Sequence, residues 1–131
     1  MKRTAVFTII AFTFLSFSGF SQESWKAPES SKSTKNPVSE KKVKASAKKG
    51  AITFNKFCIV CHGAAGLGDG PGGKALTPKP ANLTSLKVQD QKDGEIFWKI
   101  SNGRGPMIKW GPIINESDRW DLVNYIRTLK N

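Results

Sequence analysis

The segment from position 63 to position 82 cannot form a regular helix or strand. Six of its residues are glycine and three are proline. Glycine loses more conformational freedom on folding than any other residue, and proline cannot donate a backbone hydrogen bond, so such a run is a loop. A loop this long in a compact domain is usually functional or disordered. Any fold of this chain must therefore accommodate a long irregular segment.

Three short helices are predicted around this loop, at about residues 46–57, 93–102 and 117–129. Apolar residues recur at spacings of three and four in the second and third ranges, and Asp93 is the expected N-cap of the second helix. About 85 residues with three short helices and long loops bury little apolar surface. We therefore predict an all-α domain with a large apolar cofactor at its centre.

The first 21 residues have the pattern of an export signal. Met1-Lys2-Arg3 supplies positive charge, residues 5–20 are apolar, and small residues lie at positions 19 and 21, where a signal peptidase would cut. The apolar run is shorter than the roughly 20 residues that cross a bilayer. We expect the signal to be cleaved, and an uncleaved membrane anchor is the alternative.

The chain is strongly basic, with 21 Lys and Arg against 10 Asp and Glu and a formal charge of +11. Residues 22–50 carry 8 basic and 3 acidic groups, and residues 51–131 carry 11 and 7. No helix-turn-helix or zinc-finger pattern accompanies the charge, so we expect no nucleic-acid partner. Residues 22–46 are rich in Ser, Lys and Pro and predict a disordered linker before a folded domain at 47–131.

The motif Cys58-Ile59-Val60-Cys61-His62 contains the only two cysteines and the only histidine of the chain. Cys-x-x-Cys-His is typical of c-type haem attachment. The two thiols would add to the two haem vinyl groups as thioethers, and the imidazole of His62 would then reach the iron from one face. The motif therefore predicts one covalently bound haem c and its iron.

Three other interpretations compete with haem attachment for the two cysteines. A structural zinc site needs four ligands, and the chain offers two thiolates and one imidazole. A dithiol redox site usually follows a strand, and no strand pattern precedes Cys58. Two ordinary buried cysteines fit the motif alone, but the export signal and the order of helix, motif and glycine-rich loop favour haem.

The sixth iron ligand follows by elimination. The suitable side chains are His and Met, with Lys possible, and there is no second His. Met1 lies in the leader, which leaves Met107 in Gly105-Pro106-Met107-Ile108. The alternative role of Met107 is to fill the core. A His/Met pair closes both axial positions and raises the reduction potential, which favours an electron carrier over an enzyme.

Residues 47–131 resemble class I c-type cytochromes. Gly50 and Phe54 resemble the first helix of that family, where a small residue meets an aromatic residue of the last helix, here expected to be Tyr125. Further similarity to small bacterial periplasmic members lies in Cys61-His62-Gly63, in Gly66-Leu67-Gly68-Asp69-Gly70, in Pro78-Lys79-Pro80-Ala81-Asn82-Leu83 and in residues 93–103. The resemblance implies a cytochrome c fold, with three main helices and long loops wrapped around one haem that exposes one edge.

The resemblance also implies a proline carbonyl that accepts a hydrogen bond from the His62 ring. Pro80 is the expected residue, with Pro71 and Pro78 as alternatives. Three residues could line the haem or bind its propionates, or could instead pack in the core or face solvent: Trp98, Arg104 and Trp110. Family members often carry Met followed by Pro, whereas here Pro106 precedes Met107, which affects the expected geometry of this loop.

The sequence therefore predicts an exported, periplasmic, monomeric electron carrier that is not an enzyme. It would pass single electrons between redox partners, such as a terminal oxidase or reductase, through the exposed haem edge. Basic residues near that edge would steer an acidic partner: Lys74, Lys79, Lys87 and Lys109. The alternatives are a haem relay subunit tethered to a larger respiratory complex, and a haem enzyme or ligand sensor.

Overall fold

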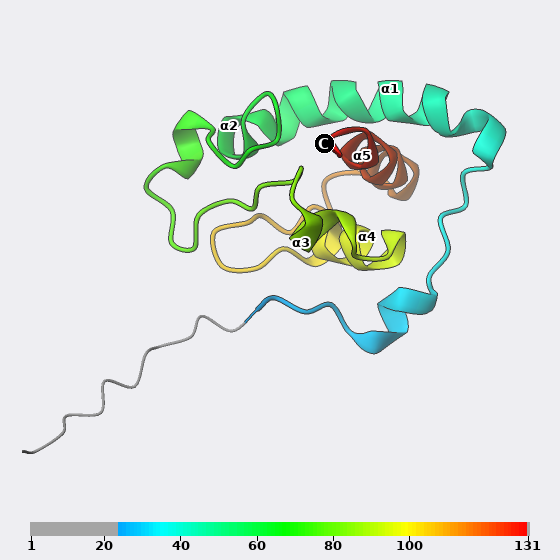
Figure 1. Cartoon of the computed structure of the whole chain (residues 1–131), viewed down its shortest axis with the longest axis horizontal. Helices are drawn as coiled ribbons and strands as arrows, with labels where there is room; N and C mark the ends of the chain where they lie inside the picture. Colours follow the sequence, from blue (N-terminus) through cyan, green and yellow to red (C-terminus); the bar gives the residue numbers. More distant parts are fainter. Residues whose placement is uncertain (1–23, 131) are drawn as a thin grey trace, which may run out of the picture.

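The computed structural model describes residues 24–130, and this part of the chain folds into helices joined by long loops (Figure 1). No strand is present among these residues, so the predicted all-α fold is confirmed. Five α-helices are formed: α1 (Glu40–Phe57), α2 (Ile59–His62), α3 (Leu86–Gln89), α4 (Asp93–Asn102) and α5 (Glu116–Thr128). Two 3-10 helices, η1 (Glu29–Ser33) and η2 (Pro71–Gly73), lie in the connecting segments.

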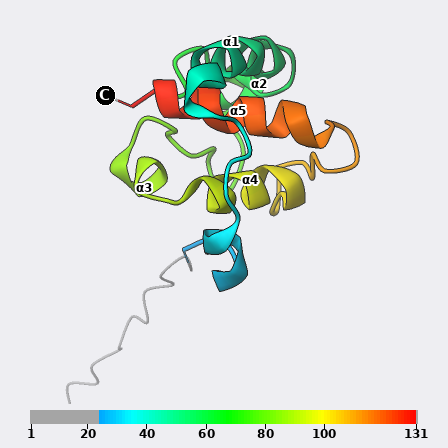
Figure 2. The same ribbon diagram turned by 90° about the vertical axis from the view of Figure 1, so that its right-hand side faces the viewer.

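The centre of the fold is the crossing of α1 and α5: α1 runs along the page in Figure 1, where α5 is seen end-on, and α5 runs along the page in Figure 2, where α1 is seen end-on. A Cβ atom on Gly50 would lie 2.0 Å from the carbonyl oxygen of Asp121, so only glycine allows the helices to approach this closely. The rings of Phe54 and Tyr125 lie 5.0 Å apart beside this contact. The expected pairing of a small residue and an aromatic residue across the first and last helices is therefore confirmed.

Helix α4 packs against α5 on the side away from α1. The rings of Phe97 and Trp120 stack at 4.1 Å with an angle of 12° between their planes. The N-cap of α4 is Lys92, whose backbone N–H donates to Glu95 at 2.8 Å. Asp93 is therefore the first helical residue and not the predicted N-cap, because its carboxylate is bound by Arg127.

The structure differs from the expectation of a disordered linker at 22–46. Helix α1 begins at Glu40, six residues before its predicted start. The reason is its composition: residues 40–50 are mainly Lys and Ala, which favour helices, and Ser46 and Ala47 face the core and are buried. Lysine on the exposed side of a helix contributes to the helix even though it adds nothing to a core.

The residues before α1 also pack on the domain. Asn36 donates hydrogen bonds to Asp93 at 2.9 Å and to Asn124 at 2.8 Å. Trp25 lies 6.5 Å from Trp98, ring centre to ring centre. The part of this segment around η1 therefore lies beside α4 on the side away from α1, and the chain then runs past α5 to the start of α1 (Figure 2).

The predicted leader, residues 1–21, lies outside the described residues, and export stays a prediction. Within residues 24–130, none of the helices combines the length and the apolar content that a membrane span needs.

Candidate haem-binding site

The Cys-x-x-Cys-His motif forms a single helical turn directly after α1. The backbone N–H groups of Cys61 and His62 both donate to the carbonyl of Cys58, at 3.1 and 2.9 Å. Residues three and four positions apart in a helix project from the same side. Both thiols and the imidazole therefore lie along one side of this turn, and both thiols are free and half-buried.

The same geometry opposes the two other chemical interpretations of the cysteines. Among residues 24–130, no group of three His, Cys, Asp or Glu side chains is placed to hold a metal ion, whereas a structural zinc site needs four ligands. Burial, with a smaller effect of neighbouring Cys61, raises the pKa of the Cys58 thiol to about 12. A reactive dithiol site needs a lowered thiol pKa instead.

The ring of His62 is held by one backbone hydrogen bond. Its Nδ1 lies 3.1 Å from the carbonyl oxygen of Ala81, and because a carbonyl can only accept, Nδ1 carries the proton. Burial lowers the pKa of His62, while this hydrogen bond acts in the opposite direction. The resulting neutral imidazole has its Nε2 lone pair available, which is the form that binds metals.

The partner of His62 is thus Ala81 and not the expected Pro80. The carbonyl of Pro80 is directed at the neighbouring loop, where a Cβ atom on Gly68 would lie only 2.4 Å from it. Pro71 and Pro78 do not make this hydrogen bond either. Any residue can offer a carbonyl, so the sequence could place the acceptor only to within the segment around Pro80.

The glycine-rich loop folds back onto the motif. Gly63 has a φ of +77° and ends α2, a conformation that favours glycine. The N–H of Gly68 then donates to the carbonyl of His62 at 2.8 Å, and that of Gly70 to Cys61 at 3.1 Å. The glycines that exclude a helix in residues 63–82 therefore let the chain approach the motif closely.

Met107 lies in the loop between α4 and α5. The backbones of Arg104 and Met107 exchange two hydrogen bonds, of 3.1 and 3.0 Å, which make a tight turn. The Met107 side chain is half-buried, and its loop lies on the same side of the molecule as α2 (Figure 1). No contact that the structure gives joins Met107 to His62, so its bond to iron remains a prediction.

The other three candidate residues lie in different surroundings. The ring of Trp110 is 5.3 Å from Phe57, the residue before Cys58, so this side chain lies close to the motif. Trp98 instead packs against Trp25 of the N-terminal segment. Arg104 is exposed in the Met107 loop. Their roles toward haem are not decided by these contacts and stay predictions.

These residues fit a covalently attached haem. The two thiols and the imidazole share one side of a turn, and the imidazole is already oriented by Ala81. Large apolar side chains in the loops after the motif and after Met107 are exposed to solvent: Leu67 (45%), Ile108 (54%) and Ile113 (58%). A large apolar group bound between these loops would remove such side chains from water.

Comparison with known proteins agrees with this site. The family model described as "Cytochrome C oxidase, cbb3-type, subunit III" matches residues 45–126, which include the motif and Met107. No curated protein matches the chain. Among solved structures, a chain of the reducing HAO-like protein complex of Kuenenia stuttgartiensis superposes with a TM-score of 0.61 at 21% identity. The alignment covers 75% of this chain and 50% of that one, so it supports the fold alone and spans half of the neighbour's length.

Proposed function

Because this chain belongs to the family described as cytochrome C oxidase, cbb3-type, subunit III, we propose that it is a single-haem electron carrier with iron ligated by His62 and Met107. Family membership gives the cofactor, a covalently bound haem c with iron, and the general function of electron transfer. The observation that most supports the proposal is the helical turn that presents Cys58, Cys61 and His62 on one side, with the His62 ring bonded to Ala81.

Each residue of the site has a separate task in this proposal. Cys58 and Cys61 would hold the porphyrin, and His62 and Met107 would bind the iron, which would leave no position on the iron for a small molecule. The haem iron supplies one-electron exchange between Fe(III) and Fe(II). The Ala81 carbonyl keeps the imidazole in one tautomer and one orientation, which limits the rearrangement that accompanies electron transfer.

The proposal is tested by expressing the chain with a functioning cytochrome c maturation system. We expect the mature protein to exceed its polypeptide mass by one haem and to show a Soret band that survives acidic acetone extraction. A spectroscopic redox titration is expected to be reversible and to follow a one-electron curve. A protein with the mass of its amino acids alone and without Soret absorption would contradict the proposal.

The partners and the location also belong to the proposal. The leader pattern of residues 1–21 supports export to the periplasm. The family description favours a second candidate function, that of a haem relay subunit within a larger respiratory complex. Co-purification of the native protein with membranes and with an oxidase at high salt supports the relay subunit, whereas release as a soluble monomer supports the carrier.

We propose that exposed lysines near the site guide an acidic redox partner. Lys74 and Lys79 lie in the loop after the motif, and Lys109 lies two residues after Met107; all three are exposed. Replacing these three by glutamate is expected to lower the rate constant of electron transfer to a candidate terminal oxidase at least about tenfold at low salt. The wild-type rate is expected to fall as ionic strength rises. Stopped-flow absorption measures both.

The matched control places the same charge change on another surface. Lys41, Lys44 and Lys48 are exposed on α1, on the side away from α5. Their replacement by glutamate is expected to change the rate much less than the first triple variant does. Equal effects of the two triple variants, or a wild-type rate that does not depend on salt, would contradict steering by this surface.

A further inference from the structure

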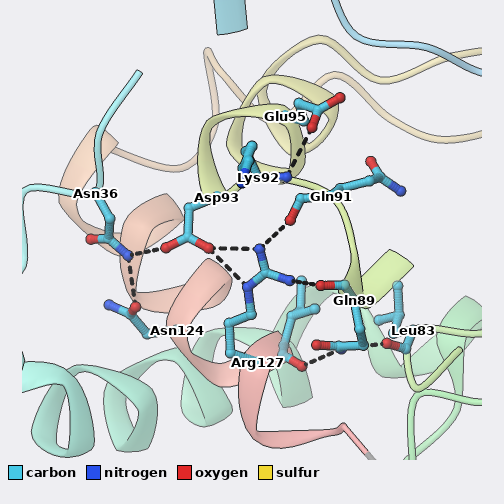
Figure 3. A network of polar contacts seen from close by, with 10 residues as sticks. Asn36, Leu83, Gln89, Gln91, Lys92, Asp93, Glu95, Asn124 and Arg127 are labelled. Atoms are coloured by element: carbon cyan, nitrogen blue, oxygen red, sulfur yellow. Dashed lines mark hydrogen bonds and ion pairs between the residues drawn. The ribbon is translucent and has the colours of Figure 1, made fainter. Parts of the chain in front are cut away.

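The side chain of Gln89, at the end of α3, connects two distant parts of the chain. It is buried, and its Nε2 donates to the carbonyl of Leu83 at 2.7 Å and to that of Ile126, in α5, at 2.9 Å (Figure 3). Its Oε1 is buried and has no hydrogen-bond partner among the described residues. Because a buried acceptor without a partner is unfavourable, the two donated bonds must fix the orientation of this amide.

The carbonyl of Leu83 belongs to the segment that carries the hydrogen-bond partner of His62. Leu83 is itself buried, and its N–H donates to the carbonyl of Gly66 at 2.7 Å. Two residues earlier, the carbonyl of Ala81 accepts from the imidazole. On the other side, Gly68 approaches so closely that a Cβ atom there would lie 3.2 Å from the Ala81 oxygen. The segment 80–83 is therefore held between the glycine-rich loop and Gln89.

The backbone around Gln89 is in turn fixed to α5 by Arg127. The guanidinium donates to the carbonyl of Gln89 at 2.6 Å and to the carboxylate of Asp93 at 2.8 Å, and it also bonds the carbonyl of Gln91 (Figure 3). Hydrogen bonds from a charged donor are stronger than neutral ones. Gln89 is thus a rigid bridge that links α5 to the loop of Ala81.

We propose that Gln89 is a positioning residue for the iron-binding imidazole, acting through Leu83 and Ala81 on the Nδ1–H of His62. The inference rests on the proposed function, because it concerns His62 as an iron ligand. Without the amide donors, the Leu83 carbonyl loses its partner and the Ala81 carbonyl moves away from the ring. A weaker hydrogen bond at Nδ1 makes the imidazole a poorer electron donor to iron, which favours Fe(II) and raises the reduction potential.

The test uses the haem-loaded protein with Gln89 replaced by methionine, which has similar length and no donor. In the reduced protein, NMR follows the exchange of the His62 Nδ1–H with deuterium. We expect about tenfold faster exchange, as the loss of roughly one hydrogen bond implies, together with a shift of the reduction potential to a more positive value. The control is Gln91→Met, because the Gln91 amide bonds Lys87 and Lys99 and not Leu83.

A lower melting temperature of the Gln89→Met variant with unchanged exchange and potential would overturn the proposal, because it would show a structural role only. If that variant does not fold, Gln89→Asn replaces it; its shorter amide retains the donors, and a smaller change in the same direction is expected. Unchanged values in Gln89→Asn then overturn the inference. A wild-type protein without covalent haem would instead refute the proposed function.

Discussion

The double substitution of Cys58 and Cys61 by serine is expected to abolish covalent haem attachment completely. These are the only thiols in the chain, and serine has no sulfur with which to form a thioether. A cofactor that binds only the folded state stabilises it, so the variant is also expected to lose most of its cooperative thermal unfolding. Mass spectrometry, the Soret band after acidic acetone extraction and circular dichroism melting measure these effects.

The control for this variant is Val60→Ala, which changes the motif between its two cysteines. Val60 is 53% exposed, so its truncation removes little packing. It is expected to keep the haem and to change stability by less than about 0.5 kcal/mol. A double serine variant that still carries the mass of haem would contradict the assigned attachment.

Replacement of Met107 by alanine is expected to leave His62 as the only axial side chain on the iron. The red charge-transfer band of a methionine–iron bond disappears, the reduced protein binds carbon monoxide, and the reduction potential falls by on the order of 0.2 V because a potential-raising ligand is lost. Absorption spectra and a redox titration measure all three. All three changes are expected in a protein that still carries its haem, because both cysteines remain.

Ile52→Ala is the control, since this side chain is 72% exposed on α1 and its truncation leaves the Met107 loop unchanged. It is expected to keep the red band and to exclude carbon monoxide. If the wild-type protein lacks the band and binds carbon monoxide readily, Met107 is not a ligand, and the haem enzyme or ligand sensor replaces the carrier as the better hypothesis.

The sequence predicted those parts of the fold that periodic patterns specify. Helix α4 occupies the predicted range 93–102, and α5 begins and ends one residue earlier than predicted. Apolar spacing defines such helices because they bury one stripe against the core. The meeting of Gly50 and Tyr125 was predicted by family resemblance, and the 2.9 Å from a Gly50 Cβ position to the Tyr125 Cβ explains why a small residue is needed.

Other features depend on single contacts that composition does not reveal. Residues 24–39 are polar, as in many disordered linkers, yet Asn36 and Trp25 hold them on the domain. The acceptor for His62 is set by which carbonyl the backbone turns toward the ring, and this depends on the close approach of Gly68. The role of Gln89 was not predicted, because a glutamine in a polar segment carries no motif.

The packing of residues 24–39 on the domain limits how far the domain could move from a membrane anchor at its N-terminus. As a free chain, these 16 residues could extend to roughly 55 Å. Because these residues are docked on the domain, most of that reach is lost, and a leader retained in a bilayer would hold the domain close to the membrane. A redox partner would then have to diffuse to the haem, because the domain could not move far from the membrane.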